Sequence, residues 1–175
     1  MKSTGILRRI DELGRIVIPK EIRRHLRIRD GESLEIFIDN NDIVLKKHSM
    51  MDTISSIAQK CVLSFNEQTK TNILIADRDK IIAASNSIKK NYLALNISEE
   101  LGNLILERKP ISYQNKGTIN IIEGKPESDN YIAVPIIAHG DPVGLVLVLI
   151  KVDNEDKEAE KLAFFIADFL GKYLE

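Results

Sequence analysis

Apolar and polar residues alternate along residues 33–38, a spacing typical of a strand with one face turned inward. A run of Asp and Asn at 39–42 follows and predicts a turn, and the apolar segment 43–47 predicts the returning strand of a hairpin. Upstream, the pattern predicts further short elements: strands at 5–10 and 15–18, a turn at 11–14, and a helix at 20–26 behind Pro19.

From residue 51 onward the elements become longer and more strongly apolar. The continuously apolar segment 145–150 predicts the central strand of a sheet. Ser98, followed by two glutamates, predicts a helix start. The remaining predicted elements are helices at about 51–70, 99–109 and 155–174, strands at 72–76, 80–85 and 119–122, and a hairpin of 131–138 with 143–152.

This order of elements predicts an α+β protein of two domains. We expect a small N-terminal domain at 1–50, a connecting helix at 51–70, and an antiparallel sheet flanked by helices at 71–175. A core of fewer than 50 residues is rarely stable without disulfides or a metal. Cys61 is the one cysteine of the chain, so no disulfide can form within a chain, and we expect no metal site. We therefore expect dimerisation to stabilise the N-terminal domain.

The last predicted helix carries more apolar residues than one face requires. We expect Ala159, Leu162, Ala163, Ile166, Leu170 and Tyr173 to be buried, whereas Phe165 and Phe169 lie to one side. These two phenylalanines either contact a partner subunit or belong to the subunit's own core. If this helix and helix 51–70 pair with their copies, a four-helix contact would build a tetramer or a second dimer interface.

Charge is distributed unevenly between the two parts of the chain. Residues 2–29 hold 9 Lys/Arg and 3 Asp/Glu, a charge of +6, whereas the whole chain carries −1. A basic segment of this density indicates a polyanion as partner.

The segment RRIDELGRIVIPKEIRRHL at residues 8–26 closely resembles the AbrB family of bacterial transition-state regulators, and the match extends over residues 1–47. The resemblance implies a swapped-hairpin dimer, in which two chains interleave strands into one barrel-like core and present arginines to double-stranded DNA. It implies DNA contacts at Arg8, Arg9, Arg15, Arg23 and Arg24, with Lys2 and Lys20 as peripheral phosphate contacts.

The segments 131–136 and 141–148 resemble the strand pair that is common in GAF domains, which bind small molecules in some proteins and only dimerise in others. Both roles remain open, and an effector pocket is predicted near Ser85, Asn86, Tyr92 and Tyr131. Together the two resemblances imply a cytoplasmic, nucleoid-associated transcriptional regulator of sporulation genes. The alternative is an antitoxin, because the same N-terminal fold occurs in that class.

Other kinds of chemistry have little support in the sequence. The three histidines are isolated and lack the spacing of metal ligands, so we expect no metal site and no cofactor. There is no glycine-rich phosphate loop and no recognisable nucleophile–base pair, so we do not expect an enzyme. The longest apolar run is far shorter than the ~20 residues of a membrane helix, and the start of the chain lacks an apolar signal region.

Overall fold

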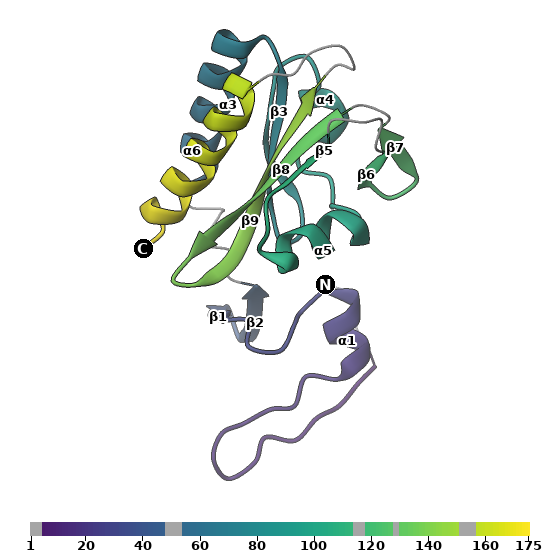
Figure 1. Ribbon diagram of the computed structural model, residues 1–175. Helices are drawn as coiled ribbons and strands as arrows, with labels where there is room; N and C mark the ends of the chain where they lie inside the picture. Colours follow the sequence, from purple (N-terminus) through teal and green to yellow (C-terminus); the bar gives the residue numbers. More distant parts are fainter. Residues whose placement is uncertain (1–4, 48–53, 114–117, 128–129, 151–156) are drawn as a thin grey trace. The chain divides into compact units, whose positions relative to one another are not determined.

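The computed structural model describes residues 5–47, 54–113, 118–127, 130–150 and 157–175 (Figure 1). The chain divides into two compact units, Met1–His48 and Ser49–Glu175. The division falls within residues 48–53, which lie outside the described ranges and include the domain boundary that we expected at residue 50.

The first unit contains one helix and one hairpin. Helix α1 (Lys20–His25) follows Pro19, as predicted. Strands β1 (Leu34–Asp39) and β2 (Asp42–Lys47) pair antiparallel, with Leu34 opposite Lys47. Asn40 in the connecting turn has φ +54°, a conformation that asparagine tolerates better than most residues.

The two strands predicted at 5–10 and 15–18 are wrong for the single chain, because the structure has no regular strand there. The turn between them is formed as predicted. The N–H of Gly14 donates to the carbonyl of Asp11 at 3.0 Å, and Gly14 has φ +76°. A strand needs a neighbouring strand to satisfy the hydrogen bonds of its backbone. Within the described part of the chain, the segments 5–10 and 15–18, the two arms of this turn, have no neighbouring strand.

Large apolar side chains of the first unit remain exposed. Leu7 is 92% exposed and Ile38 is 83% exposed, and Ile10, Leu13 and Val17 are also exposed. Leu34, Ile36 and Ile38 share a strand face, as the alternation predicted, but nothing in the single unit covers that face well. Residues 5–47, the described part of this unit, therefore form no hydrophobic core of their own in a single copy.

The second unit is built on a five-stranded antiparallel sheet. Its order is β4-β3-β9-β8-β5, which places β9 in the centre and confirms the prediction for residues 145–150. The strands are β3 (Asn72–Asp77), β4 (Ile81–Ala84), β5 (Ile111–Tyr113), β8 (Asn130–Ala138) and β9 (Asp141–Ile150).

Helices α3 (Ser55–Thr69) and α6 (Lys157–Tyr173) cover one face of this sheet (Figure 1). Ala58, Val62 and Phe65 from α3 pack in one core cluster with Ile73 and Ile166. We expected a connecting helix over 51–70, and the structure places α3 within the core of the second unit. The expected burial of Tyr173 is wrong, because Tyr173 is 55% exposed and the neighbouring Leu174 packs against the core in its place.

The other face of the sheet has a separate core. It is covered by helices α4 (Lys89–Tyr92) and α5 (Glu99–Glu107) and by the hairpin of β6 (Ile119–Ile122) and β7 (Lys125–Glu127). Ser98 caps α5, as predicted, since its side chain accepts the N–H of Leu101 at 3.0 Å. The Ser98 hydroxyl also donates to the carbonyl of Asn120, which ties the β6–β7 hairpin to the start of α5.

Candidate nucleic-acid interface

The turn at 11–14 positions Arg15 through the carboxylate of Asp11. Oδ1 of Asp11 accepts the backbone N–H of Leu13 at 3.0 Å and that of Arg15 at 2.8 Å. Oδ2 accepts the Nε–H of the Arg15 guanidinium at 2.7 Å. These bonds, the backbone N–H of Arg15 first and its side chain second, hold the pKa of Asp11 below its usual range. Asp11 is therefore ionised at neutral pH.

Arg8 and Arg9 lie on the arm that precedes this turn, and both are exposed. Nη1 of Arg8 lies 3.5 Å from the carbonyl oxygen of Leu7, at the limit of a hydrogen bond. Arg8 and Arg15 thus lie on opposite sides of the same turn. Lys2 lies outside the described residues.

Helix α1 carries the second group of basic residues. Lys20 begins the helix and is exposed, and Arg24 is exposed one turn later. Nη1 of Arg23 donates to Oδ1 of Asp30 at 2.7 Å, in an ion pair whose carboxylate side chain is 94% exposed. The enclosed Nε of Arg23 has no hydrogen-bond partner within the described ranges. Arg23 is therefore held by the loop that follows the helix.

An inner ion pair joins that loop to the hairpin. The Glu32 side chain is 8% exposed and lies 3.2 Å from the ammonium of Lys47 in β2. Oε2 of Glu32 also accepts the backbone N–H of Arg29 at 2.9 Å. The ammonium of Lys47 donates in addition to the carbonyl of Arg27 at 3.0 Å. Glu32 and Lys47 thus fix the end of β2 to the segment behind α1.

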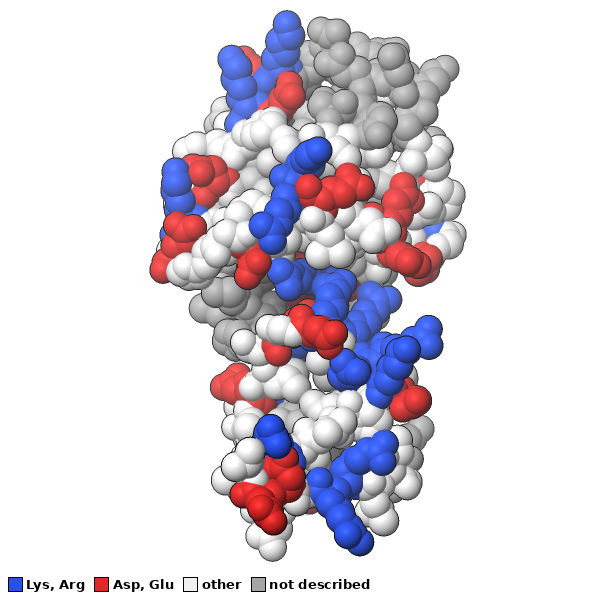
Figure 2. Space-filling view, turned by 60° about the horizontal axis from the view of Figure 1, so that its bottom comes forward, with Lys and Arg blue, Asp and Glu red and all other residues white. Residues whose placement is uncertain are grey.

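The sequence did not identify the acidic partners of these arginines. Asp11 and Arg15 have the i, i+4 spacing of an ion pair, but in a turn this spacing carries little information. Asp30 lies seven residues after Arg23, and only the folded loop brings the two together. Lys and Arg side chains gather in the lower half of Figure 2, with acidic side chains next to some of them.

The residues predicted for an effector pocket do not form one group. The buried Ser85 hydroxyl accepts the N–H of Ile73 at 2.9 Å, so it already bonds the main chain, and Asn86 is exposed. Tyr92 and Tyr131 are buried in the same core cluster. The Tyr92 hydroxyl donates to the carboxylate of Glu127.

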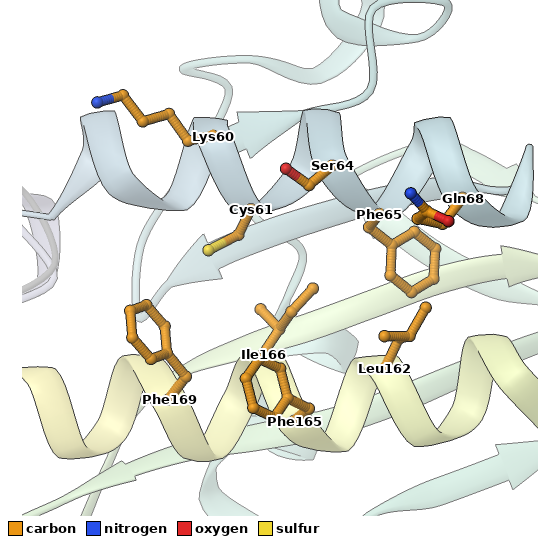
Figure 3. Close-up of a pocket in the computed structure, with 9 residues that line it drawn as sticks. All are labelled: Lys60, Cys61, Ser64, Phe65, Gln68, Leu162, Phe165, Ile166 and Phe169. Atoms are coloured by element: carbon orange, nitrogen blue, oxygen red, sulfur yellow. The ribbon is translucent and has the colours of Figure 1, made fainter.

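The structure shows an apolar pocket elsewhere, between α3 and α6 (Figure 3). Its volume is about 350 Å³. Phe165 and Phe169 line it with ring centroids 6.3 Å apart and are 65% and 39% exposed, so they lie outside the subunit's own core. Burial raises the pKa of the Cys61 thiol, which favours the neutral form. The other lining residues are Lys60, Ser64, Phe65, Gln68, Leu162 and Ile166.

The described residues offer neither a metal site nor a membrane-spanning helix. In the described ranges, no group of three or more His, Cys, Asp or Glu side chains is placed to hold a metal ion. Among the helices of that same part of the chain, none has both the length and the apolar character needed to cross a membrane.

Two family models match the chain, one over each unit. The model "Stage V sporulation protein T C-terminal, transcription factor" matches residues 53–175. The model "Antidote-toxin recognition MazE, bacterial antitoxin" matches residues 7–52.

Individual proteins show the same division. Stage V sporulation protein T of Bacillus subtilis is 40% identical over 177 residues, covering 100% of this chain and 99% of the relative. Transition state regulatory protein AbrB of the same organism is 58% identical over 48 residues, which are 27% of this chain and 50% of AbrB. The GAF domain of an Acinetobacter phosphoenolpyruvate-protein phosphotransferase is 14% identical with a TM-score of 0.53, covering 74% of this chain and 84% of that domain. At this identity the last similarity is one of fold.

Proposed function

Since this chain belongs to the stage V sporulation protein T family of transcription factors, we propose that two copies of its first unit combine to bind double-stranded DNA through a shared face of arginines. The first unit is AbrB-like in sequence, and the second has a GAF-like fold. The observation that carries the proposal is the placement of Arg8 and Arg15 on either side of one turn, with Arg23 and Arg24 on a helix of the same unit.

The exposed apolar side chains of the first unit support a dimer. Leu7 and Ile38 would cost roughly 1.5–3 kcal/mol each in lost burial if they stayed in water. A second copy would cover them and would provide neighbouring strands for the arms at 5–10 and 15–18. The swapped-hairpin arrangement satisfies both needs at once.

The proposed contacts are Arg8, Arg9, Arg15, Arg23 and Arg24, with Lys2 and Lys20 at the periphery. Arginine suits this role because its guanidinium stays charged and its planar fork fits two phosphate oxygens or the edge of a guanine. The face has no recognition helix of the usual length, since α1 spans only Lys20–His25. We therefore expect recognition through DNA shape and flexibility more than through a strict base sequence.

Salt dependence tests this face directly. Arg8, Arg15, Arg23 and Arg24 from both chains would make eight phosphate contacts, so the logarithm of the association constant should fall against the logarithm of salt concentration with a slope of roughly −7. The measurement is a fluorescence-anisotropy titration of the whole chain with duplex DNA at several salt concentrations. A slope near −2 would contradict a face of this size.

An antitoxin function is less well supported. The family model that matches residues 7–52 is named for antitoxins, and this match is the observation that favours an antitoxin function. Antitoxins of this type usually end in a disordered segment that binds the toxin. The described residues from 54 onward instead build a sheet with a core on each face. Purification of the chain with a bound toxin-like protein would revive this alternative.

Assembly beyond the dimer would use α3 and α6. Their pocket is apolar, and Phe165 is largely exposed there. Contact with the same helices of a second copy would cover both phenylalanines and would join two dimers into a tetramer. We also propose that the second unit binds an effector at Ser85, Asn86, Tyr92 and Tyr131. These residues are divided between the core and the surface, so they support effector binding less than residues of one shared pocket would.

Replacing Phe165 with serine should therefore halve the mass of the assembly. Burial of an exposed phenylalanine contributes roughly 1.5–3 kcal/mol, so its loss should weaken this contact by about tenfold or more. Light scattering after size exclusion measures the mass. The matched control is Leu106→Ser, because Leu106 is 49% exposed on α5, at the other face of the sheet. Equal masses for the two variants would argue against an α3–α6 interface.

The remaining parts of the proposal follow from the family. A transcription factor needs no catalytic centre, so we propose no enzymatic activity and no cofactor for this chain. We also propose that the protein acts in the cytoplasm in association with the nucleoid, because its proposed partner is DNA.

A further inference from the structure

Two arginines of the first unit are paired with an aspartate, but at different nitrogen atoms of the guanidinium. Asp30 occupies Nη1, one of the two terminal nitrogens of the Arg23 guanidinium. Asp11 occupies Nε of Arg15, at the base of the guanidinium. The two terminal nitrogens of Arg15 make no hydrogen bond within the described part of the chain, and its side chain is 72% exposed.

This geometry leaves the double-donor edge of the Arg15 guanidinium, formed by its two terminal nitrogens, without a hydrogen-bond partner in the described part of the chain. A guanidinium held at Nε still presents its two terminal nitrogens, and one terminal N–H pair suffices for the two oxygens of a phosphate or for O6 and N7 of guanine. The carboxylate that holds it is itself fixed by two backbone N–H groups. Arg15 is therefore anchored to the main chain of the turn and remains free at its tip.

We propose that Asp11 is a positioning residue for DNA binding, which holds the Arg15 guanidinium in the orientation that contacts the duplex. The inference rests on the proposed function. A free arginine side chain loses rotamer freedom when it binds, and immobilising such a side chain costs roughly 0.5–1.5 kcal/mol. Asp11 removes part of this cost before DNA arrives, in both copies of the chain.

The negative charge of Asp11 has an effect on DNA affinity that opposes its positioning of Arg15. Asp11 is an anion near a proposed phosphate site, so its removal would also relieve electrostatic repulsion. Glu12 is an exposed acid in the same turn, and within the described residues it makes no hydrogen bond or ion pair with Arg15. Asp11→Asn and Glu12→Gln each remove one negative charge from the turn, so a comparison of the two cancels the general effect of charge.

The Asp11→Asn variant is chosen to keep the turn. Its side-chain oxygen still accepts the N–H groups of Leu13 and Arg15, but its amide NH2 meets the Nε–H of Arg15, and two donors cannot bond. We expect Asp11→Asn to bind duplex DNA about fivefold more weakly than Glu12→Gln, from two copies of a small ordering cost. Equal or tighter binding by Asp11→Asn overturns the proposal.

A second comparison tests whether the effect acts through Arg15. In a chain that carries Arg15→Ala, adding Asp11→Asn should cause no further loss of affinity. An undiminished fivefold loss in this background would show that Asp11 acts on the turn in general, and it would overturn the proposal. Circular dichroism and light scattering on each variant verify that fold and assembly are unchanged.

A spectroscopic readout needs no DNA. The Nε–H resonance of Arg15 in the whole chain should exchange slowly with water, and it should shift and exchange faster in Asp11→Asn. An identical resonance in both proteins would overturn the ion pair in solution. If the wild-type chain and Glu12→Gln fail to bind duplex DNA, the proposed function fails with the inference. If both bind and Asp11→Asn binds equally well, only the inference fails.

Discussion

Replacing Arg24 with alanine is expected to weaken binding to duplex DNA about sixtyfold at about 0.1 M salt. A dimer carries Arg24 twice, so the variant loses two phosphate contacts, and each contact changes the salt exponent by roughly 0.9. Arg24 is exposed on α1, and its guanidinium has no hydrogen bond or ion pair within the described ranges. Its loss should therefore remove a DNA contact and leave the folded unit intact.

The same titration of the variant should show a slope that is less steep by roughly 2. Lys90→Ala is the matched control, because Lys90 is an exposed cation on α4 in the second unit and its removal changes net charge equally. We expect the control to change affinity by less than about twofold, since Lys90 does not belong to the proposed arginine face and an exposed charge outside that face is largely screened at this salt concentration. Equal losses in the two variants would mean that net charge governs binding, and the arginine face would have to be abandoned.

Replacing Gly171 with alanine should destabilise the second unit by about 3 kcal/mol or more. Helix α6 lies so close to β8 at this point that an added Cβ would be 2.2 Å from the carbonyl oxygen of Ile137. The atom that it meets belongs to the backbone of a long strand, so the helix as a whole would have to move away from the sheet. Urea unfolding, followed by circular dichroism of the whole chain, measures the loss.

Gly102→Ala is the matched control for this prediction. Gly102 is also a buried helical glycine, on α5, but its added Cβ would meet only the end of the Ile97 side chain, at 4.0 Å. Alanine favours helix over glycine by about 0.8–1.0 kcal/mol. We expect Gly102→Ala to be neutral or stabilising. A loss of stability equal to that of Gly171→Ala would show that the close approach of α6 to β8 is not the cause.

Much of the second unit could be predicted because the spacing of its apolar residues indicates which segments are buried. The apolar residues at 145–150 indicated a strand with neighbours on both sides, and β9 is the central strand. Ser98 indicated a helix start and accepts the N–H of Leu101. Gly171 could not be identified as a contact point, because glycine in a helix gives no sign of which strand lies next to it.

The site was predicted less completely than the fold. The basic residues on the turn and on α1 followed from charge and from a family motif, but their partners did not. The Ser85 hydroxyl looked available for a ligand, yet it bonds the main chain of Ile73. A hydroxyl group can bond a ligand or the backbone equally well, and only the position of a neighbouring strand decides between the two.

The sequence by itself determined which residues are charged, where the chain turns, and that the first 47 residues cannot enclose a core. These properties depend on local composition and spacing, which a linear chain already contains. Only the tertiary structure decided that Asp11 holds Arg15 at Nε, that Asp30 holds Arg23, and that Phe165 and Phe169 remain outside the core. Each of these depends on the position of a side chain relative to another element, and that position exists only after the chain has packed.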